Sequence, residues 1–251
     1  MEQINAIENE SEEIKALRKT AELGDANAQC DLGFKYERGQ GVNKNYDEAV
    51  KWYRKAADQG FAKGQYNLGV MYDNGEGVKQ DYTEAVNWYR KAADQGYASA
   101  QCDLGFMYAN GQGVSQSYEE ARKWYLKAAD QGDATAQYNL GNAYGFGRGV
   151  PQDTAEAMKW YRKAADQGDA DAQAQIGTLY SGWPGILKDD VESLAWFYVA
   201  VSYGATEIFL SSREKAVGSH GRLAAQKRAA EISAEIAAKK AANSNTSSDQ
   251  Q

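Results

Sequence analysis

The stretch that decides the fold is Asp25–Gly60, DANAQCDLGFKYERGQGVNKNYDEAVKWYRKAADQG, because the chain repeats it with small changes four more times. Three residue types mark the repeat at intervals of 36 residues: Trp52, Trp88, Trp124, Trp160 and Trp196; Tyr36, Tyr72, Tyr108, Tyr144 and Tyr180; and Gly24, Gly60, Gly96, Gly132, Gly168 and Gly204. A fixed interval of this size is typical of a stacked array of one small unit and not of a single closed globule.

Each copy contains two apolar stripes at helical spacing. In the first copy, Ala28, Leu32 and Tyr36 follow one another at intervals of four residues, and a wider apolar face surrounds Trp52. Both patterns predict amphipathic helices. A glycine recurs inside the first stripe, at Gly33, Gly69, Gly105, Gly141 and Gly177. Because glycine within a helix costs about 1 kcal/mol relative to alanine, its recurrence predicts close packing between the two helices.

Turn and capping residues separate the predicted helices. The second helix is preceded five times by a polar residue that stands three positions before a glutamate: Asn45 and Glu48, Asp81 and Glu84, Ser117 and Glu120, Asp153 and Glu156, Asp189 and Glu192. This spacing predicts a capping box, in which each side chain accepts from the other residue's backbone N–H. Gly60 and Gly96 predict left-handed helix ends. The loop Gly39–Val42 predicts a turn whose valine packs back into the core.

These residues resemble a known repeat. The pattern Ala28, Leu32, Gly33, Tyr36, Gly39, Gly41, Val42, followed by Ala49, Trp52, Tyr53, Lys55, Ala56, Ala57, Gln59, Gly60, is similar to the Sel1-like repeat, a longer relative of the tetratricopeptide repeat. The resemblance implies an all-α, right-handed α-solenoid of 36-residue helix-turn-helix repeats. It also implies that first helices line a concave wall and that the protein is an adaptor that binds other proteins without catalysis. Cysteine pairs of disulfide-rich secreted members are missing from this sequence.

The resemblance and the composition shifts give the domain boundaries. We predict a disordered N-terminal segment at 1–11, an N-terminal capping helix at 12–24, and five repeats at 25–60, 61–96, 97–132, 133–168 and 169–204. The last repeat is more apolar than the others, around Trp196, which favours a covering element after it. We therefore predict a C-terminal helical cap at 205–241 and a disordered tail at 242–251. The alternative is that the helix at 221–241 dimerises.

Charge and composition exclude several kinds of partner. A net charge of −7 and a pI near 5.0 argue against nucleic-acid or anionic-membrane surfaces, which need clustered cations. No stretch approaches the about 18 apolar residues of a membrane span. If Met1 is the native start, we expect a cytoplasmic protein; a trimmed leader would leave a periplasmic or secreted protein. We expect Cys30 and Cys102 to be free thiols, because stacking holds equivalent positions too far apart for a disulfide. We also expect a monomer.

The chain carries few residues of the types used in catalysis or metal binding. Its one histidine, His220, is distant in sequence from both cysteines, which leaves no pattern for a metal cluster or a nucleophile–base set. The Gly-x-Gly-Val loops lack the strand and the following Gly-Lys-Ser/Thr of a phosphate-binding loop. We therefore predict no enzyme activity, no cofactor and no metal site.

The predicted concave wall is the remaining candidate site. The tetratricopeptide resemblance orients the first helices so that certain positions beside the packed Leu and Tyr face a partner. These candidate partner-binding residues are Asn27, Asp31, Phe34, Glu37, Tyr66, Asn67, Val70, Asp73, Asp103, Phe106, Asn110, Tyr138 and Asn142. Cys30, Cys102 and Phe146 would share the wall. Aromatic side chains alternate there with Asp or Asn, a mixture that suits an extended or helical peptide. For each aromatic, the alternative is that it fills space between neighbouring first helices.

We therefore predict a non-catalytic protein-interaction scaffold that binds a peptide segment of a partner protein in its concave groove. The alternative is a cell-envelope protein associated with carbohydrate or peptidoglycan, which the stackable aromatics on the wall would also suit. The basic rows of the second helices, such as Lys51, Arg54 and Lys55 beside Asp58, are typical of a solvated helix surface.

Overall fold

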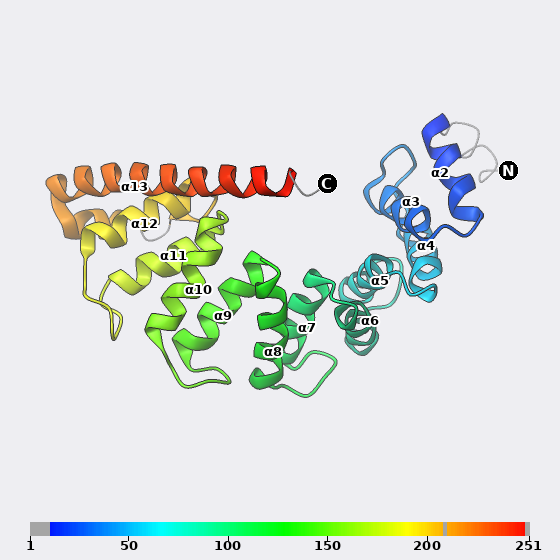
Figure 1. Cartoon of the computed structure of the whole chain (residues 1–251), viewed down its shortest axis with the longest axis horizontal. Coiled ribbons are helices and arrows are strands. Elements are labelled where there is room, and N and C mark those ends of the chain that lie inside the picture. The colour runs from blue at the N-terminus through cyan, green and yellow to red at the C-terminus, as the bar shows by residue number, and fades with distance from the viewer. Residues whose placement is uncertain (1–10, 208–209, 249–251) are drawn as a thin grey trace. The chain divides into compact units, whose positions relative to one another are not determined.

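The computed structural model describes residues 11–207 and 210–248, and its regular elements there are all helices (Figure 1). The chain starts these with α2 (Glu12–Glu22). Four complete repeats alternate a first and a second helix: α3 (Ala26–Arg38) and α4 (Tyr46–Asp58), α5 (Ala62–Asn74) and α6 (Tyr82–Asp94), α7 (Ala98–Asn110) and α8 (Tyr118–Asp130), α9 (Ala134–Phe146) and α10 (Thr154–Asp166). The fifth repeat contains α11 (Ala170–Tyr180) and α12 (Asp190–Ser202), and α13 (Leu210–Ser248) follows. The predicted all-α repeat of helix pairs is confirmed.

The chain divides into two compact units, Met1–Trp124 and Tyr125–Gln251, here called unit 1 and unit 2. Within unit 1, each first helix packs against its own second helix and against the second helix of the preceding repeat, as α5 does with α6 and α4. Within unit 2, α11 packs in the same way against α12 and α10. Each unit is therefore a stack in which every helix is buried by its neighbours.

The recurrent tryptophans contribute to the core of each layer. Trp52 packs with Ala21 of α2 and Leu32 of α3, whereas Trp88 packs with Leu68 of its own repeat and with residues of the preceding one. Trp52, Trp88, Trp160 and Trp196 are buried, and Trp124 is partly buried. The indoles thus join consecutive layers, as the 36-residue interval predicts.

The glycine inside the first helix makes room for an aromatic ring of the second. A Cβ built at Gly69 would lie 2.7 Å from Cδ1 of Tyr89, and one at Gly177 would lie 2.8 Å from a ring carbon of Phe197. Both distances are shorter than real Cβ contacts. The packing role predicted for this glycine is therefore confirmed, and its cause is the ring that follows the tryptophan.

Only half of each predicted capping box forms. The side chain at the N-cap accepts from the glutamate's backbone N–H, as Asn45 does from Glu48 at 3.1 Å. The reciprocal bond was predicted wrongly: the N-cap N–H donates to the carbonyl of the tyrosine in the preceding first helix, as from Asn45 to Tyr36 at 3.0 Å. The glutamate binds a lysine instead, as Glu48 does with Lys51 at 2.6 Å. Each inter-helix loop is thereby tied to its own repeat.

A buried glutamine, which the sequence reasoning missed, joins each first helix to the preceding layer. Gln29, Gln65, Gln101, Gln137 and Gln173 are buried. In each case the side-chain amide donates to a carbonyl near the end of the preceding second helix, as Gln65 does to Ala57 O at 3.3 Å. In three copies its oxygen also accepts from a glutamine after the following second helix, as Gln65 does from Gln95 at 2.7 Å. These amides are therefore satisfied by backbone and side-chain partners.

The last helix, α13, covers the fifth repeat (Figure 1). It bends at Gly218, which has φ 68° and ψ −175°. Its buried side chains Ala225, Ala229, Ile232 and Ile236 belong to the same core cluster as Trp196. Full burial of an isoleucine side chain contributes about 1.5–3 kcal/mol, so this face contributes substantially to unit 2.

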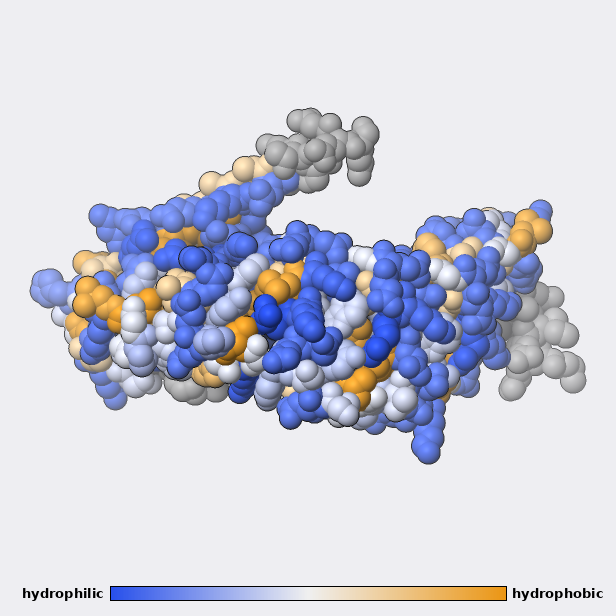
Figure 2. Space-filling model, turned by 60° about the horizontal axis from the view of Figure 1, so that its bottom comes forward, coloured by the Kyte–Doolittle hydropathy of each residue, from blue (hydrophilic) through white to orange (hydrophobic). Residues whose placement is uncertain are grey.

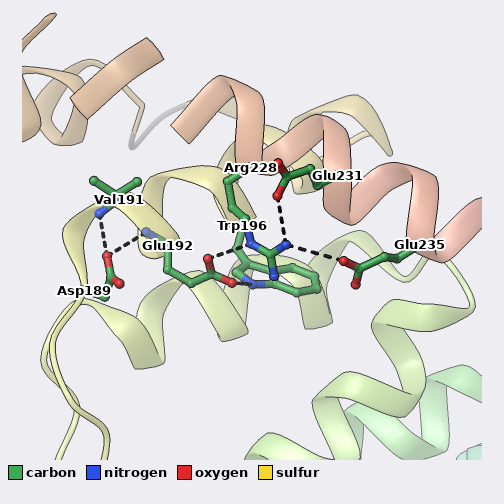
Figure 3. Close-up of polar contacts among 7 residues, drawn as sticks. All are labelled: Asp189, Val191, Glu192, Trp196, Arg228, Glu231 and Glu235. Carbon is green, nitrogen blue, oxygen red and sulfur yellow. Dashed lines mark hydrogen bonds and ion pairs between the residues drawn. The ribbon is translucent and has the colours of Figure 1, made fainter. Parts of the chain in front are cut away.

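Polar contacts complete the junction between α12 and α13 (Figure 3). Glu192 accepts from the Trp196 indole at 3.1 Å and pairs with Arg228 Nε at 3.0 Å. Arg228 also pairs with Glu231 and Glu235 of its own helix, at 3.3 and 3.4 Å. Glu192 therefore links the core tryptophan of the last repeat to the helix that covers it.

The chain ends differ from the predicted boundaries in one respect. Helix α13 continues to Ser248, whereas we predicted a disordered tail from position 242. Once a helix is nucleated, each added residue forms one more backbone bond, and the Ala-rich sequence after Ile236 favours that propagation. At the other end, Ser11 caps α2 by accepting from Ile14 N at 3.3 Å. The predicted disorder of residues 1–10 and 249–251 lies outside the described residues.

Candidate partner-binding surface

All thirteen predicted partner-binding residues lie on first helices, and none of them is fully buried. The exposed ones are Asn27, Phe34, Phe106 and Asn110, and the partly exposed ones are Asp31, Glu37, Tyr66, Asn67, Val70, Asp73, Asp103, Tyr138 and Asn142. Unit 1 carries all of them except Tyr138 and Asn142, which lie on α9 of unit 2. The structure therefore brings the unit 1 residues onto three successive first helices, α3, α5 and α7.

Phe34, Val70 and Phe106 occupy the same position in these three helices, and we call them the apolar row. The Phe34 side chain is 38% exposed and Phe106 is 50% exposed, while Val70 packs partly against the core. Arg38 lies over the Phe34 ring, 5.6 Å from its centre. Large exposed aromatics at recurring positions are unusual in a chain that buries most of its aromatic side chains.

Tyrosines of the second helices hold the polar residues of this face. Tyr53 donates to Glu37 at 2.7 Å, and Tyr89 donates to Asp73 at 3.0 Å. Burial, together with the hydrogen bond to a carboxylate, raises the pKa of both tyrosines. In unit 2 the fourth repeat has glycine at the corresponding acidic position, and Tyr161 donates to Asn142 at 2.8 Å instead. The face is thus fixed from behind by hydroxyl groups of the core.

Contacts between consecutive first helices make the face continuous within unit 1. Lys63 of α5 pairs with Asp31 of α3 at 3.3 Å, and Asn67 of α5 donates to the Cys30 sulfur at 3.4 Å. The Tyr66 ring lies 5.1 Å from that of Tyr97, at the start of α7. Residues from three repeats therefore share one surface.

The two cysteines were wrongly predicted to lie on this wall. Cys30 is fully buried in the core of unit 1, and Cys102 is also buried. Both are free thiols, as predicted. Desolvation raises the pKa of Cys30 to about 11. Position 30 faces the neighbouring repeat, where Asn67 covers it, and so it is not available to a partner.

Unit 2 offers a smaller version of the face. Tyr138 is partly buried, with its ring 6.0 Å from that of Tyr161. Phe146 is 47% exposed at the end of α9 and meets the edge of Trp183 at 5.5 Å. Trp183 itself is partly buried against the core of unit 2. The aromatics at equivalent places therefore differ in role: Tyr66 and Tyr138 fill space between helices, whereas Phe34 and Phe106 remain accessible.

The second helices carry a solvated polar surface, as predicted. Lysines pair with the capping glutamates three residues earlier, as in Lys123 with Glu120 and Lys159 with Glu156. Other lysines lie over buried indoles, with Lys55 3.8 Å from the centre of the Trp52 ring. On the side drawn in Figure 2, apolar surface occurs as small patches surrounded by polar surface. Exposed pairs of this kind contribute little to stability.

Two further properties bear on the class of protein. Within 11–207 and 210–248, no helix is both long and apolar enough to cross a membrane. The same residues contain no group of three or more His, Cys, Asp or Glu side chains that could hold a metal ion.

Stacked helix pairs of constant length define an α-solenoid repeat protein. The Sel1 repeat family model matches residues 26–61, 62–97, 98–133, 134–169 and 170–202, and the chain belongs to this family. Sel1 repeat proteins generally mediate protein–protein interactions and are typically non-catalytic scaffolds. No curated protein matches the chain.

Solved structures agree with this assignment. A protective antigen of uropathogenic Escherichia coli with an SLR fold is 42% identical, with a TM-score of 0.73 over 76% of this chain and 41% of that protein. The chain therefore spans less than half of that relative. A Sel1 repeat protein from Oxalobacter formigenes is 39% identical, with a TM-score of 0.68 over 73% of this chain and 76% of that one. A putative Sel1 repeat protein from Klebsiella pneumoniae is 22% identical with a TM-score of 0.52 over 88% and 99%, and this likeness concerns the fold alone.

Proposed function

We propose that the chain is a non-catalytic scaffold that binds a peptide segment of a partner protein on the first-helix face of unit 1. The observation that carries this proposal is the apolar row, in which Phe34 and Phe106 stay exposed on a surface whose polar groups are held in place. Aromatic side chains provide contact area, and fixed polar groups beside them bind the peptide backbone. The neighbouring carboxylates and amides, such as Asp73 and Asn110, fit this role.

The family supports the proposal in general terms, because Sel1 repeat proteins bind protein partners. The structure also selects the residues to change. Tyr66 and Tyr138 pack against Tyr89 and Tyr161, so replacing them would disturb the fold as well as the surface. Phe34 and Phe106 can be changed with less effect on the core, since both are exposed.

The test is co-purification from the native cell, followed by peptide mapping and calorimetry with the mapped segment. We expect Phe34→Ala with Phe106→Ala to weaken the segment's binding by at least about 2 kcal/mol, roughly thirtyfold, the loss typical of a central aromatic contact. The matched control is Leu187→Ala with Leu223→Ala, which also removes two exposed apolar side chains and lies in unit 2.

Equal binding by wild type and the phenylalanine variant would refute the proposed surface. If the control variant alone loses binding, the partner uses unit 2. A partner that proves to be a glycan, bound by the purified chain with the same dependence on Phe34 and Phe106, would favour the alternative of a carbohydrate-associated protein.

A further inference from the structure

Unit 1 contains a group of three tyrosines and two carboxylates, which we call the tyrosine–carboxylate cluster. Tyr66 and Asp73 come from α5, Tyr89 from α6, Tyr97 precedes α7, and Asp103 lies on α7. The Tyr66 ring lies 5.8 Å from Tyr89 and 5.1 Å from Tyr97, with tilted planes. Tyr89 is buried, whereas the other four side chains are partly exposed. The cluster is therefore an aromatic surface with acidic groups that a partner can reach.

The negative charges of this cluster are held by neutral donors. Asp73 accepts from Tyr89 at 3.0 Å, and Tyr66 donates a hydrogen bond to Asp103. Burial and then the carboxylates of Asp103 and Asp73 raise the pKa of Tyr89, which places both charges near one hydroxyl. No described lysine or arginine pairs with Asp73. A neutral hydroxyl satisfies a carboxylate oxygen without cancelling its charge, so a cation beside the cluster is favoured.

The chain itself places cations on this face in the neighbouring layer. Lys63 extends from α5 to Asp31 of α3, with 3.3 Å between Nζ and Oδ1. Arg38 lies over the Phe34 ring and also pairs with Glu37 at 3.1 Å. Each of these acidic groups thus accepts a basic side chain. The position of α7 equivalent to Lys63 is Ser99, so the chain offers no lysine at that position one layer on.

Apolar surface beside the cluster fits the stem of a basic side chain. Val70 stands three residues before Asp73, and Phe106 stands three residues after Asp103, so each lies on the same helix surface as its acidic neighbour. Lysine and arginine bury their methylene stems on apolar surface while the charged end binds elsewhere. The faces of tyrosine rings attract cations in addition.

We infer that the peptide bound by unit 1 is basic and that one of its lysine or arginine side chains binds between Asp73 and Asp103, against Tyr66 and Tyr97. This inference rests on the proposed function and adds the chemistry of the partner. The basic side chain lies with its stem along the apolar row and its charged end at the two carboxylates.

The test uses two libraries of short random peptides of equal length, displayed for selection by the full chain. The central residue is lysine or arginine in one library and glutamate or aspartate in the other. We expect the basic library to yield about tenfold more bound peptides, the factor for one charge-assisted hydrogen bond. High salt lowers this ratio, because it screens partly exposed charges.

The variant Asp73→Asn with Asp103→Asn brings the ratio close to one. Asparagine keeps an acceptor for the tyrosine hydroxyl, as Asn142 does for Tyr161, so the fold is retained and circular dichroism checks it. The matched control is Asp58→Asn with Asp94→Asn, which removes the same net charge at the ends of α4 and α6. It leaves the ratio unchanged.

The outcomes separate the inference from the function on which it rests. Equal recovery from both libraries, with binding that still depends on Phe34 and Phe106, overturns the basic partner and leaves the peptide-binding surface standing. A tenfold preference that survives in the Asp73 and Asp103 variant also overturns the inference. Failure of both libraries to yield any peptide that depends on Phe34 and Phe106 overturns the proposed function and the inference together.

Discussion

Two glycines of α9 allow the packing role of the recurrent glycine to be measured inside one helix. A Cβ at Gly141 would lie 3.0 Å from Cγ of Tyr161 and closer still to two other ring carbons. Tyr161 is only 1% exposed and its hydroxyl is bonded to Asn142, so the ring has little room to move. At Gly145 the nearest atoms would be the Tyr161 hydroxyl at 3.5 Å and the Ala157 Cβ at 3.6 Å, which are ordinary contacts.

The two alanine variants share one effect and differ in the other. Alanine in place of a helical glycine gains about 1 kcal/mol or less near a helix end. Overpacking a well-filled core costs about 1–3 kcal/mol. We therefore expect Gly145→Ala to raise the free energy of unfolding by up to about 1 kcal/mol. Gly141→Ala should lower it by up to about 2 kcal/mol, the overpacking cost less the helical gain.

Urea unfolding followed by far-ultraviolet circular dichroism measures both changes as shifts of the midpoint at constant slope. In a Tyr161→Leu background, the alanine at position 141 no longer meets the ring, so we expect the Gly141→Ala penalty to disappear. The reasoning is refuted if Gly141→Ala raises the midpoint as much as Gly145→Ala, or if its penalty is unchanged in the Tyr161→Leu background.

Three more outcomes can be checked on the same chain. Ile232→Ala should destabilise unit 2 by about 2–5 kcal/mol because the side chain is buried under α13, whereas the exposed Leu223→Ala should have little effect; thermal unfolding compares them. Gln65→Leu leaves Gln95 without its acceptor and should cost about 1–3 kcal/mol in urea unfolding, and an unchanged midpoint would count against the glutamine contacts. The raised pKa of Tyr89 means that the folded state keeps a proton that the unfolded state loses above about pH 10, so stability should fall as the pH rises past that value. Tyr89→Phe should reduce the slope of that fall, which titration of the urea midpoint with pH would reveal.

The sequence was sufficient for features that depend on contacts repeated within the array. The 36-residue interval predicted the helix pairs, and Gly69 predicted the close approach that Tyr89 requires. It misled where a local pattern has a second possible partner. The capping-box spacing is the same whether the N-cap N–H binds Glu48 or the carbonyl of Tyr36, and only the path of the loop decides between them.

The candidate surface was predicted less well, because a helical position one residue away faces a different neighbour. Asp31 is partly exposed as expected, whereas the adjacent Cys30 is buried under Asn67 of the next repeat. The buried Gln65 was missed because glutamine is usually exposed. A signal was present, since the same position holds glutamine in all five copies, which a solvated residue would not require. The role of the predicted partner-binding residues stays a prediction that the experiments above test.

The glutamine contacts also bear on how such arrays change in length. Gln65 and Gln95 stand 30 residues apart, and Gln137 and Gln167 form the same bond at the same separation. Loss or duplication of a segment of 36 residues, starting at any point in the array, would place an identical amide opposite an identical acceptor at the new junction. Recombination in whole repeats therefore leaves no stranded polar group inside the protein, while an insertion of any other length within a helix would create one.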